Sequence, residues 1–115
     1  MMTPIKIVHT TGALGLHVFF YLSTMEYFEY SFLTKYEEGL IHNRDNSDVK
    51  FERTIYSEYT VDEIKARAKK YGKRPYFLPT SNCRLFVGHV LFDKPNIDWL
   101  VVAGGATLAT IAFRQ

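Results

Sequence analysis

The spacing of apolar residues changes once along the chain, at Thr60, and this change limits the folds that the sequence can adopt. Before Thr60, apolar residues alternate with polar ones or form short runs rich in aromatic and β-branched residues, which is typical of strands. After it, Thr60-Val61-Asp62-Glu63 is a capping box, and apolar residues then recur every three or four positions, as in an amphipathic helix. The sequence therefore predicts an α+β fold in which the strands come first.

Four segments before Thr60 carry the strand pattern: 5–8, 16–22, 27–33 and 49–56. We expect the second and third to form a hairpin through residues 23–26, within a small antiparallel sheet. Residues 42–48 are polar and rich in turn formers, which predicts a surface loop.

Two helices are expected after Thr60. The first covers 61–71, buries Val61, Ile64 and Ala68, and ends at Gly72. The second starts after the connection 75–79, where Thr80 or Ser81 is a good N-cap, and runs to Phe92. The sheet is expected to pack against this second helix, whose N-terminal end carries the cysteine. The chain has 115 residues, of which 47% are hydrophobic. We therefore expect residues 1–115 to form a single domain.

Composition excludes several functional classes. One cysteine excludes an internal disulfide framework and a cysteine-rich zinc site, and we expect neither a metal nor a cofactor. The net charge of +2 is too small to indicate a nucleic-acid partner. A single thiol suits a reducing compartment, and residues 1–4 lack the plan of a signal peptide, so a cytoplasmic location is expected.

An apolar segment at 97–113 ends the chain. As a helix, residues 99–113 would be roughly 22 Å long, short of a bilayer core of about 30 Å. The segment is expected to be either a buried final element or a tail that associates the protein with a membrane.

Cys83 lies in the first turn of the predicted second helix. Unpaired amides and the positive end of the helix dipole favour a thiolate there. The amides of this helix start, around Ser81 and Asn82, could also donate to an oxyanion. This placement is typical of a nucleophile, but a buried structural cysteine that follows a cap has the same sequence signature.

A cysteine nucleophile needs a base, and the chain has four histidines. His17 opens the most hydrophobic predicted strand, where an imidazole is costly unless it is bonded or used. His89 follows Cys83 by six residues, which turns it about 240° away around a helix. His42 lies in the polar loop, and His9 is placed at the end of the first strand, at the edge of the core.

Glu29 and Ser31 lie on one face of the strand that follows His17. Either side chain could orient the imidazole of His17. Polar residues on a half-exposed strand face would give the same pattern, so both interpretations stay open.

Six basic residues lie within 65–74. Those near the end of the first helix are candidates for binding substrate or an anionic membrane surface: Lys69, Lys70, Lys73 and Arg74. A solvated helix face is the simpler interpretation of the same cluster.

The octapeptide Thr80-Ser81-Asn82-Cys83-Arg84-Leu85-Phe86-Val87 resembles the Asn-Cys-Glu-His-Phe-Val box of the lecithin:retinol acyltransferase-like family. This family includes the H-Ras-like suppressor phospholipases/acyltransferases, which are circularly permuted relatives of papain-like and NlpC-type thiol enzymes. The segment 17–22 is similar to the strand that begins with the family's catalytic histidine. Residues 62–72 and 76–78 are similar to its helix and short strand before the nucleophile, and the apolar segment after Pro95 is similar to the tail of its animal members.

The resemblance implies a permuted papain-like core, with Cys83 as nucleophile and His17 as base. It implies an acyl-thioester intermediate and a phospholipid or other acyl or amide substrate, as in a phospholipase A or acyltransferase. Arg84-Leu85 stands where the family has Glu-His, and no histidine lies at 29–31, where its third catalytic residue belongs. Either Glu29 orients His17 instead, or the triad is degenerate and the domain is an interaction or membrane-recruited module. An NlpC-type amidase or peptidase is the alternative enzyme.

Overall fold

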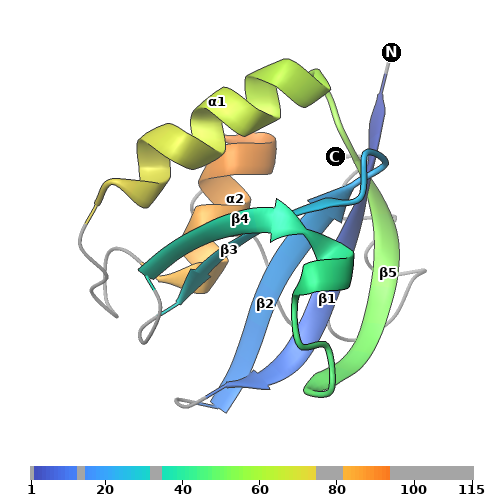
Figure 1. Ribbon diagram of the computed structural model, residues 1–115. Helices are drawn as coiled ribbons and strands as arrows, with labels where there is room; N and C mark the ends of the chain where they lie inside the picture. The colour runs from blue at the N-terminus through green and yellow to red at the C-terminus, as the bar shows by residue number, and fades with distance from the viewer. Residues whose placement is uncertain (1, 13–14, 32–34, 75–81, 94–115) are drawn as a thin grey trace.

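The computed structural model describes residues 2–12, 15–31, 35–74 and 82–93, and these residues form five strands, two α-helices and one 3₁₀ turn. In chain order the elements are β1 (Thr3–Gly12), β2 (Gly15–Leu22), β3 (Glu26–Ser31), β4 (Lys35–Leu40), η1 (Ile41–Asn43), β5 (Val49–Ser57), α1 (Val61–Gly72) and α2 (Cys83–Phe92). The strands form one antiparallel sheet in the order β4-β3-β2-β1-β5 (Figure 1). The expected α+β class is confirmed.

The alternation of residues along the strands gives the sheet two different faces. One face packs against α1 and α2, and its buried strand residues are Ile5, Ile7, Val18, Phe20, Leu22, Phe28, Tyr30 and Ile55. The helices add Ile64, Ala68, Tyr71, Cys83, Phe86, Val87, Val90 and Leu91 to this core. The opposite face carries a smaller cluster made of Val8, Phe19, Tyr27 and Ile41.

The capping box starts α1 as predicted. The Thr60 hydroxyl accepts from the Glu63 amide at 3.2 Å, and the Glu63 carboxylate accepts from the Thr60 amide at 2.9 Å. Ile64 and Ala68 are buried, whereas Val61 is only half-buried. Gly72 is the last residue of the helix, and a Cβ built on it would lie 2.3 Å from Cγ of Tyr36. A glycine is therefore needed here because the Tyr36 ring occupies the space of a side chain.

Strand β4 and the length of β1 depart from the sequence expectation. No strand was expected at Lys35–Leu40, yet β4 forms the edge of the sheet beside β3. Its Glu37 and Glu38 break the apolar alternation, and charged residues of this kind are common on edge strands, where they discourage pairing with other chains. Strand β1 runs over ten residues, further in both directions than the expected 5–8.

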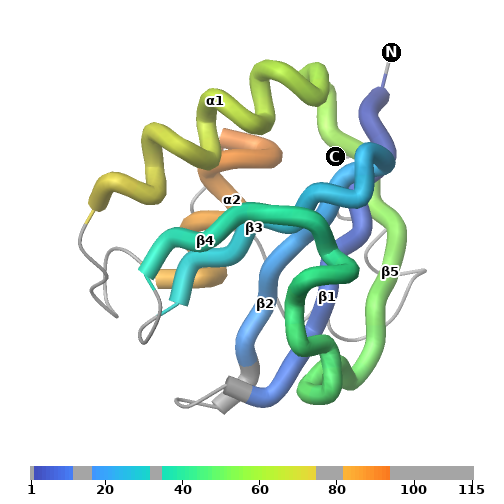
Figure 2. The backbone as a smooth tube through the Cα atoms, viewed as in Figure 1, coloured from blue at the N-terminus to red at the C-terminus, as the bar shows by residue number. Residues whose placement is uncertain are grey.

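Strands β2 and β3 separate soon after the turn that joins them. Their ladder pairs Phe20 with Phe28 and Tyr21 with Tyr27. In Figure 2, β3 and β4 bend away from β1, β2 and β5. Helix α2 contacts both β2 and β3. Residues from the start of α2, from β2 and from β3 can therefore meet where β2 and β3 are no longer paired.

Several expectations fall on residues outside the described ranges. These are Ser81 as a possible oxyanion donor, the connection 75–79 and the apolar segment 97–113. Among the helices that are described, neither is long and apolar enough to cross a membrane.

Candidate active site

Cys83 is the first residue of α2, and Asn82 is its N-cap. The Asn82 side-chain oxygen accepts from the Leu85 amide at 3.0 Å, which satisfies one donor of the first turn. The prediction of a cap at Thr80 or Ser81, two or three residues before the cysteine, is therefore wrong. An asparagine caps as well as a serine or threonine, so the cap lies one residue before the cysteine and the helix begins at Cys83 itself. The thiol keeps its expected position at the electropositive end of the helix.

A side-chain hydrogen bond joins Cys83 to His17, as the catalytic interpretation requires. Cys83 is 7% exposed and the His17 side chain 11%, so little water reaches this contact. Burial of the thiol is what the structural interpretation of Cys83 predicts, whereas its bond to an imidazole is what the catalytic interpretation predicts.

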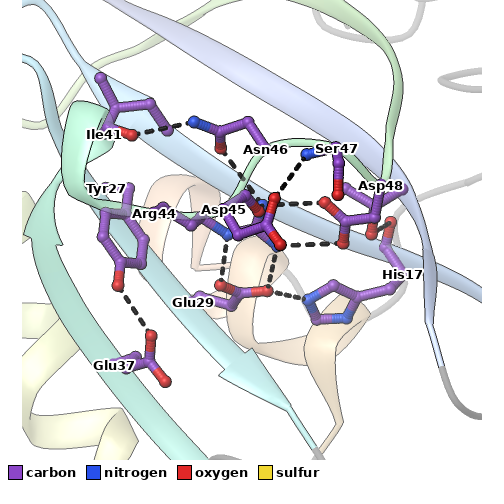
Figure 3. A network of polar contacts seen from close by, with 11 residues as sticks. His17, Tyr27, Glu29, Glu37, Ile41, Arg44, Asp45, Asn46, Ser47 and Asp48 are labelled. Atoms are coloured by element: carbon purple, nitrogen blue, oxygen red, sulfur yellow. Dashed lines mark hydrogen bonds and ion pairs between the residues drawn. The ribbon is translucent and has the colours of Figure 1, made fainter.

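Glu29 holds the other side of the imidazole. Its Oε2 atom lies 2.6 Å from Nε2 of His17 (Figure 3). Because Nε2 is engaged with Glu29, Nδ1 is the nitrogen left for the thiol. Of the two candidates for orienting His17, Glu29 makes this contact, and Ser31 is the half-buried last residue of β3. Cys83, His17 and Glu29 thus lie in one hydrogen-bonded series.

Arg44 binds the same carboxylate with a two-pronged contact. Its Nε is 2.8 Å from Oε1 of Glu29, and its Nη2 is 3.0 Å from Oε2 (Figure 3). On its far side Arg44 contacts both oxygens of Asp48, at 3.0 and 3.3 Å. The guanidinium carbon lies 4.1 Å from the centre of the Phe19 ring. Arg44 is therefore fixed by two carboxylates and an aromatic ring.

The charges of this series stabilise one another. Burial alone would lower the pKa of His17, but its hydrogen bonds to Cys83 and Glu29 and their negative charges raise it to about 9. Burial alone would raise the pKa of Glu29, but His17 and Arg44 lower it to about 2. The imidazolium and the carboxylate are therefore the resting forms at neutral pH.

Arg44 was not among the residues that the sequence indicated. The loop 42–48 does carry exposed residues, His42 among them, but the Arg44 side chain is only 10% exposed. The expectation of a solvated loop is wrong at this position, because the buried carboxylate of Glu29 draws the guanidinium inward. Nothing in the local sequence signals this, since the attracting charge lies on another strand.

The remaining histidines lie outside the series. His9 is buried and stacks on Phe51 at 4.3 Å, and burial, with the nearby Arg53, lowers its pKa to about 4. It lies within β1 rather than at a strand end, because β1 is longer than expected. The His89 ring lies 5.6 Å from that of Tyr71, consistent with the expectation that it faces away from the thiol.

The basic cluster on α1 is partly used within the fold. Lys65 pairs with Glu26 at 2.6 Å, and Arg67 donates to the backbone of Val90 at 3.0 Å. Of the four residues proposed to bind substrate or membrane, Lys69, Lys70, Lys73 and Arg74 are all exposed. The Arg74 guanidinium lies over the Tyr71 ring. Their exposure fits a solvated helix face as well as a binding surface.

Comparisons of the chain with models of known protein families, with curated proteins and with solved structures give no match.

Proposed function

We propose that this protein is a cysteine-dependent acyltransferase or hydrolase in which Cys83 is the nucleophile, His17 the base and Glu29 the residue that orients His17. The proposal rests on one observation, the hydrogen-bonded series that joins these three side chains. It takes its substrate class, the acyl ester of a phospholipid, from the resemblance to the lecithin:retinol acyltransferase-like family. The permuted papain-like core that this resemblance implies is part of the same proposal.

The first step transfers an acyl group to sulfur. The Cys83 thiolate attacks the ester carbonyl carbon, and a carbon–sulfur bond forms while the carbonyl electrons move to oxygen. Backbone amides of the first turn of α2 would stabilise this oxyanion. When the intermediate collapses, the carbon–oxygen bond of the ester breaks, and Nδ1 of His17 gives its proton to the departing alkoxide. The products are an alcohol and an acyl-thioester enzyme.

The second step returns the enzyme to its starting state. Neutral His17 takes a proton from water or an amine, which then attacks the thioester carbonyl. The carbon–sulfur bond breaks, and the sulfur leaves as thiolate beside the newly formed imidazolium. The acyl group leaves as a fatty acid or an amide. Glu29 stays ionised throughout and stabilises the imidazolium, as the carboxylate does in other acyl-transfer triads.

An intact-mass experiment tests the proposal. The protein is incubated separately with mixed phospholipids and with peptides, quenched in acid, and weighed for an adduct on Cys83. An increase by the mass of a fatty acyl group is expected with phospholipid, and none with Cys83→Ala. His17→Ala should abolish turnover. His89→Ala should not, because His89 lies on α2 but outside the series.

The outcomes separate the alternatives. An adduct with peptide alone would replace the lipid substrate by an amide and favour the amidase. No adduct and no turnover with either substrate would overturn the enzyme proposal in favour of a non-catalytic module.

Thiol alkylation supplies a test that needs no substrate. A thiolate paired with an imidazolium should react with iodoacetamide with a midpoint below the free-thiol value of about 8.5. In His17→Ala the midpoint should rise. A wild-type midpoint at the free-thiol value would count against a catalytic role for Cys83.

A further inference from the structure

Arg44 is placed so that it controls the carboxylate on which His17 depends. It approaches Glu29 through two different nitrogens, Nε and Nη2, and each meets a different carboxylate oxygen. Such a two-pronged contact fixes the plane of a carboxylate as well as its position. The Oε2 atom that Nη2 contacts is also the atom that faces His17. Arg44 therefore fixes the position of the oxygen that binds the imidazole.

Asp48 and Phe19 keep Arg44 in this orientation. Asp48 accepts from Nη1 and Nη2, and the Phe19 ring packs under the guanidinium. Nη1 also donates to the backbone oxygen of Asp45 at 2.9 Å. An arginine with this many contacts has few alternative rotamers, so Glu29 meets a preorganised partner rather than a mobile surface charge.

Burial explains why Glu29 needs such a partner. The side chains of Glu29 and Arg44 are 9% and 10% exposed. A buried carboxylate that is left without a positive partner either takes up a proton or turns toward water. A protonated or displaced Glu29 could not stabilise an imidazolium at residue 17.

We propose that Arg44 is a positioning residue, which holds the Glu29 carboxylate ionised and in the plane that orients His17 toward Cys83. The effect of Arg44 on catalysis rests on the proposed function, whereas the effect of Arg44 on the Glu29 carboxylate does not. Arg44 acts through Glu29 and His17, and no substrate contact is assigned to it.

The charged and titratable groups around Glu29 fix the direction of the expected change. His17 faces it from β2, and Arg44 faces it from the loop after η1, where Arg44 also pairs with Asp48. Tyr27 lies near it on β3, and the Tyr27 hydroxyl donates to Glu37 of β4 at 2.7 Å. Cys83 of α2 acts on it through His17. Without Arg44, one positive partner remains and burial is less opposed, so the pKa of Glu29 must rise from about 2.

Two substitutions separate the charge of Arg44 from its shape. Arg44→Gln removes the charge and the fork of donors, whereas Arg44→Lys keeps the charge on a single ammonium that cannot make the two-pronged contact. The matched control is Arg67→Gln, because Arg67 also makes partly buried contacts within the fold, to the backbone of His89 and Val90, and lies outside the site. Circular dichroism checks that each variant is folded.

The first measurement follows the Glu29 carboxyl carbon by NMR as a function of pH, with its signal assigned by its loss in Glu29→Gln. In Arg44→Gln we expect the Glu29 midpoint to rise by at least about one pH unit. In Arg44→Lys we expect it to stay near the wild-type value, and in Arg67→Gln it should not change. An unchanged midpoint in Arg44→Gln would overturn the proposal.

The second measurement is the rate of acyl turnover. Loss of orientation predicts a fall of about 100-fold in kcat for Arg44→Gln. Arg44→Lys should also turn over more slowly than wild type although its Glu29 still titrates normally, a combination that loss of stability does not produce. If Arg44→Gln does not fold, Arg44→Lys decides, since a wild-type rate there would exclude positioning by the two-pronged contact.

The two proposals fail in different ways. If wild type forms no acyl adduct with any substrate, the proposed function is wrong, and the Glu29 titration still decides whether Arg44 controls the carboxylate. If wild type is acylated and Arg44→Gln has the wild-type titration and rate, the role of Arg44 is wrong and the function stands.

Discussion

His17 and Glu29 lie on neighbouring strands, and Nε2 of the imidazole is 2.6 Å from Oε2 of the carboxylate. This contact decides which nitrogen faces the nucleophile, because the proton on Nε2 is held by Glu29 and Nδ1 is left for Cys83. It also places a negative charge beside the ring in a part of the protein where both side chains are about nine-tenths buried. Glu29 therefore contributes both orientation and charge, and substitutions can separate the two.

Replacing Glu29 by Gln tests its charge. Gln keeps a side-chain oxygen that can accept from Nε2 but removes the negative charge, so the pKa of His17 should fall from about 9 by at least about one unit. The His17 ring protons, followed by NMR across pH, measure this. Glu37→Gln is the matched control, because the Glu37 carboxylate accepts from Tyr27 on the same side of the sheet and should leave His17 unchanged.

Replacing Glu29 by Ala tests its orientation. Ala removes both the charge and the acceptor, so Glu29→Ala should lose more turnover than Glu29→Gln, which retains a neutral acceptor like that of Cys-His-Asn enzymes. Equal rates in the two variants would mean that the acceptor of residue 29 does not orient His17.

His17 and His9 together should contribute most to the unfolding free energy near pH 6.5. The folded pKa of His17, about 9, lies above its ordinary value of 6.5, so its contribution is complete below 6.5 and is lost as the pH rises through 9. The folded pKa of His9, about 4, lies below 6.5, so its contribution is complete above 6.5 and is lost as the pH falls toward 4. Urea denaturation at pH 4, 6.5 and 9 measures the curve.

Single substitutions assign the two limbs of this curve. His17→Gln should flatten the fall above pH 6.5, and His9→Gln should flatten the fall below it. The lowered pKa of Glu29 adds a further loss as the pH falls from 4.5 toward 2. An alkaline limb that persists in His17→Gln would show that another group causes it.

The sequence indicated those parts of the site whose signals are local. The capping residues Thr60 and Glu63 mark a helix start through their own spacing, and alternation places Glu29 on one face of β3 whatever its partners are. His17 stood out because a polar ring opens an apolar strand. For these residues the neighbouring sequence is sufficient to predict where the side chain lies.

Arg44 and β4 could not be predicted in this way. The inward turn of Arg44 depends on Glu29, fifteen residues away and on another strand. Strand β4 forms because the edge of β3 is available for pairing, while its charged residues hide the two-residue period that would reveal it. In both cases a tertiary contact overrides the local pattern. The spacing of residues along the sequence gives no sign of such a contact.

The close approach of Gly72 to the Tyr36 ring predicts that Gly72→Ala destabilises the protein. In a free helix Ala would be favoured over Gly by about 1 kcal/mol. Here the added Cβ would lie 2.3 Å from Cγ of Tyr36, and relief of such overpacking costs about 1–3 kcal/mol. Gly39→Ala is the control, because its Cβ would meet Tyr27 at an ordinary 3.4 Å. Urea denaturation should show a lower midpoint for Gly72→Ala than for Gly39→Ala, and the Tyr36→Ala background should abolish the difference.

The cap of α2 predicts that Asn82→Ala affects both stability and chemistry. Asn82 accepts from the Leu85 amide, and loss of an N-cap costs about 1 kcal/mol. Thr60→Ala removes the equivalent contact from α1 and should cost about the same, which makes it a matched control for stability. Only Asn82→Ala frays the turn that carries Cys83, so it alone should slow acylation and raise the alkylation midpoint of the thiol. If the two variants lose equal stability and both react at the wild-type rate, the order of the first turn of α2 does not contribute to the reactivity of Cys83.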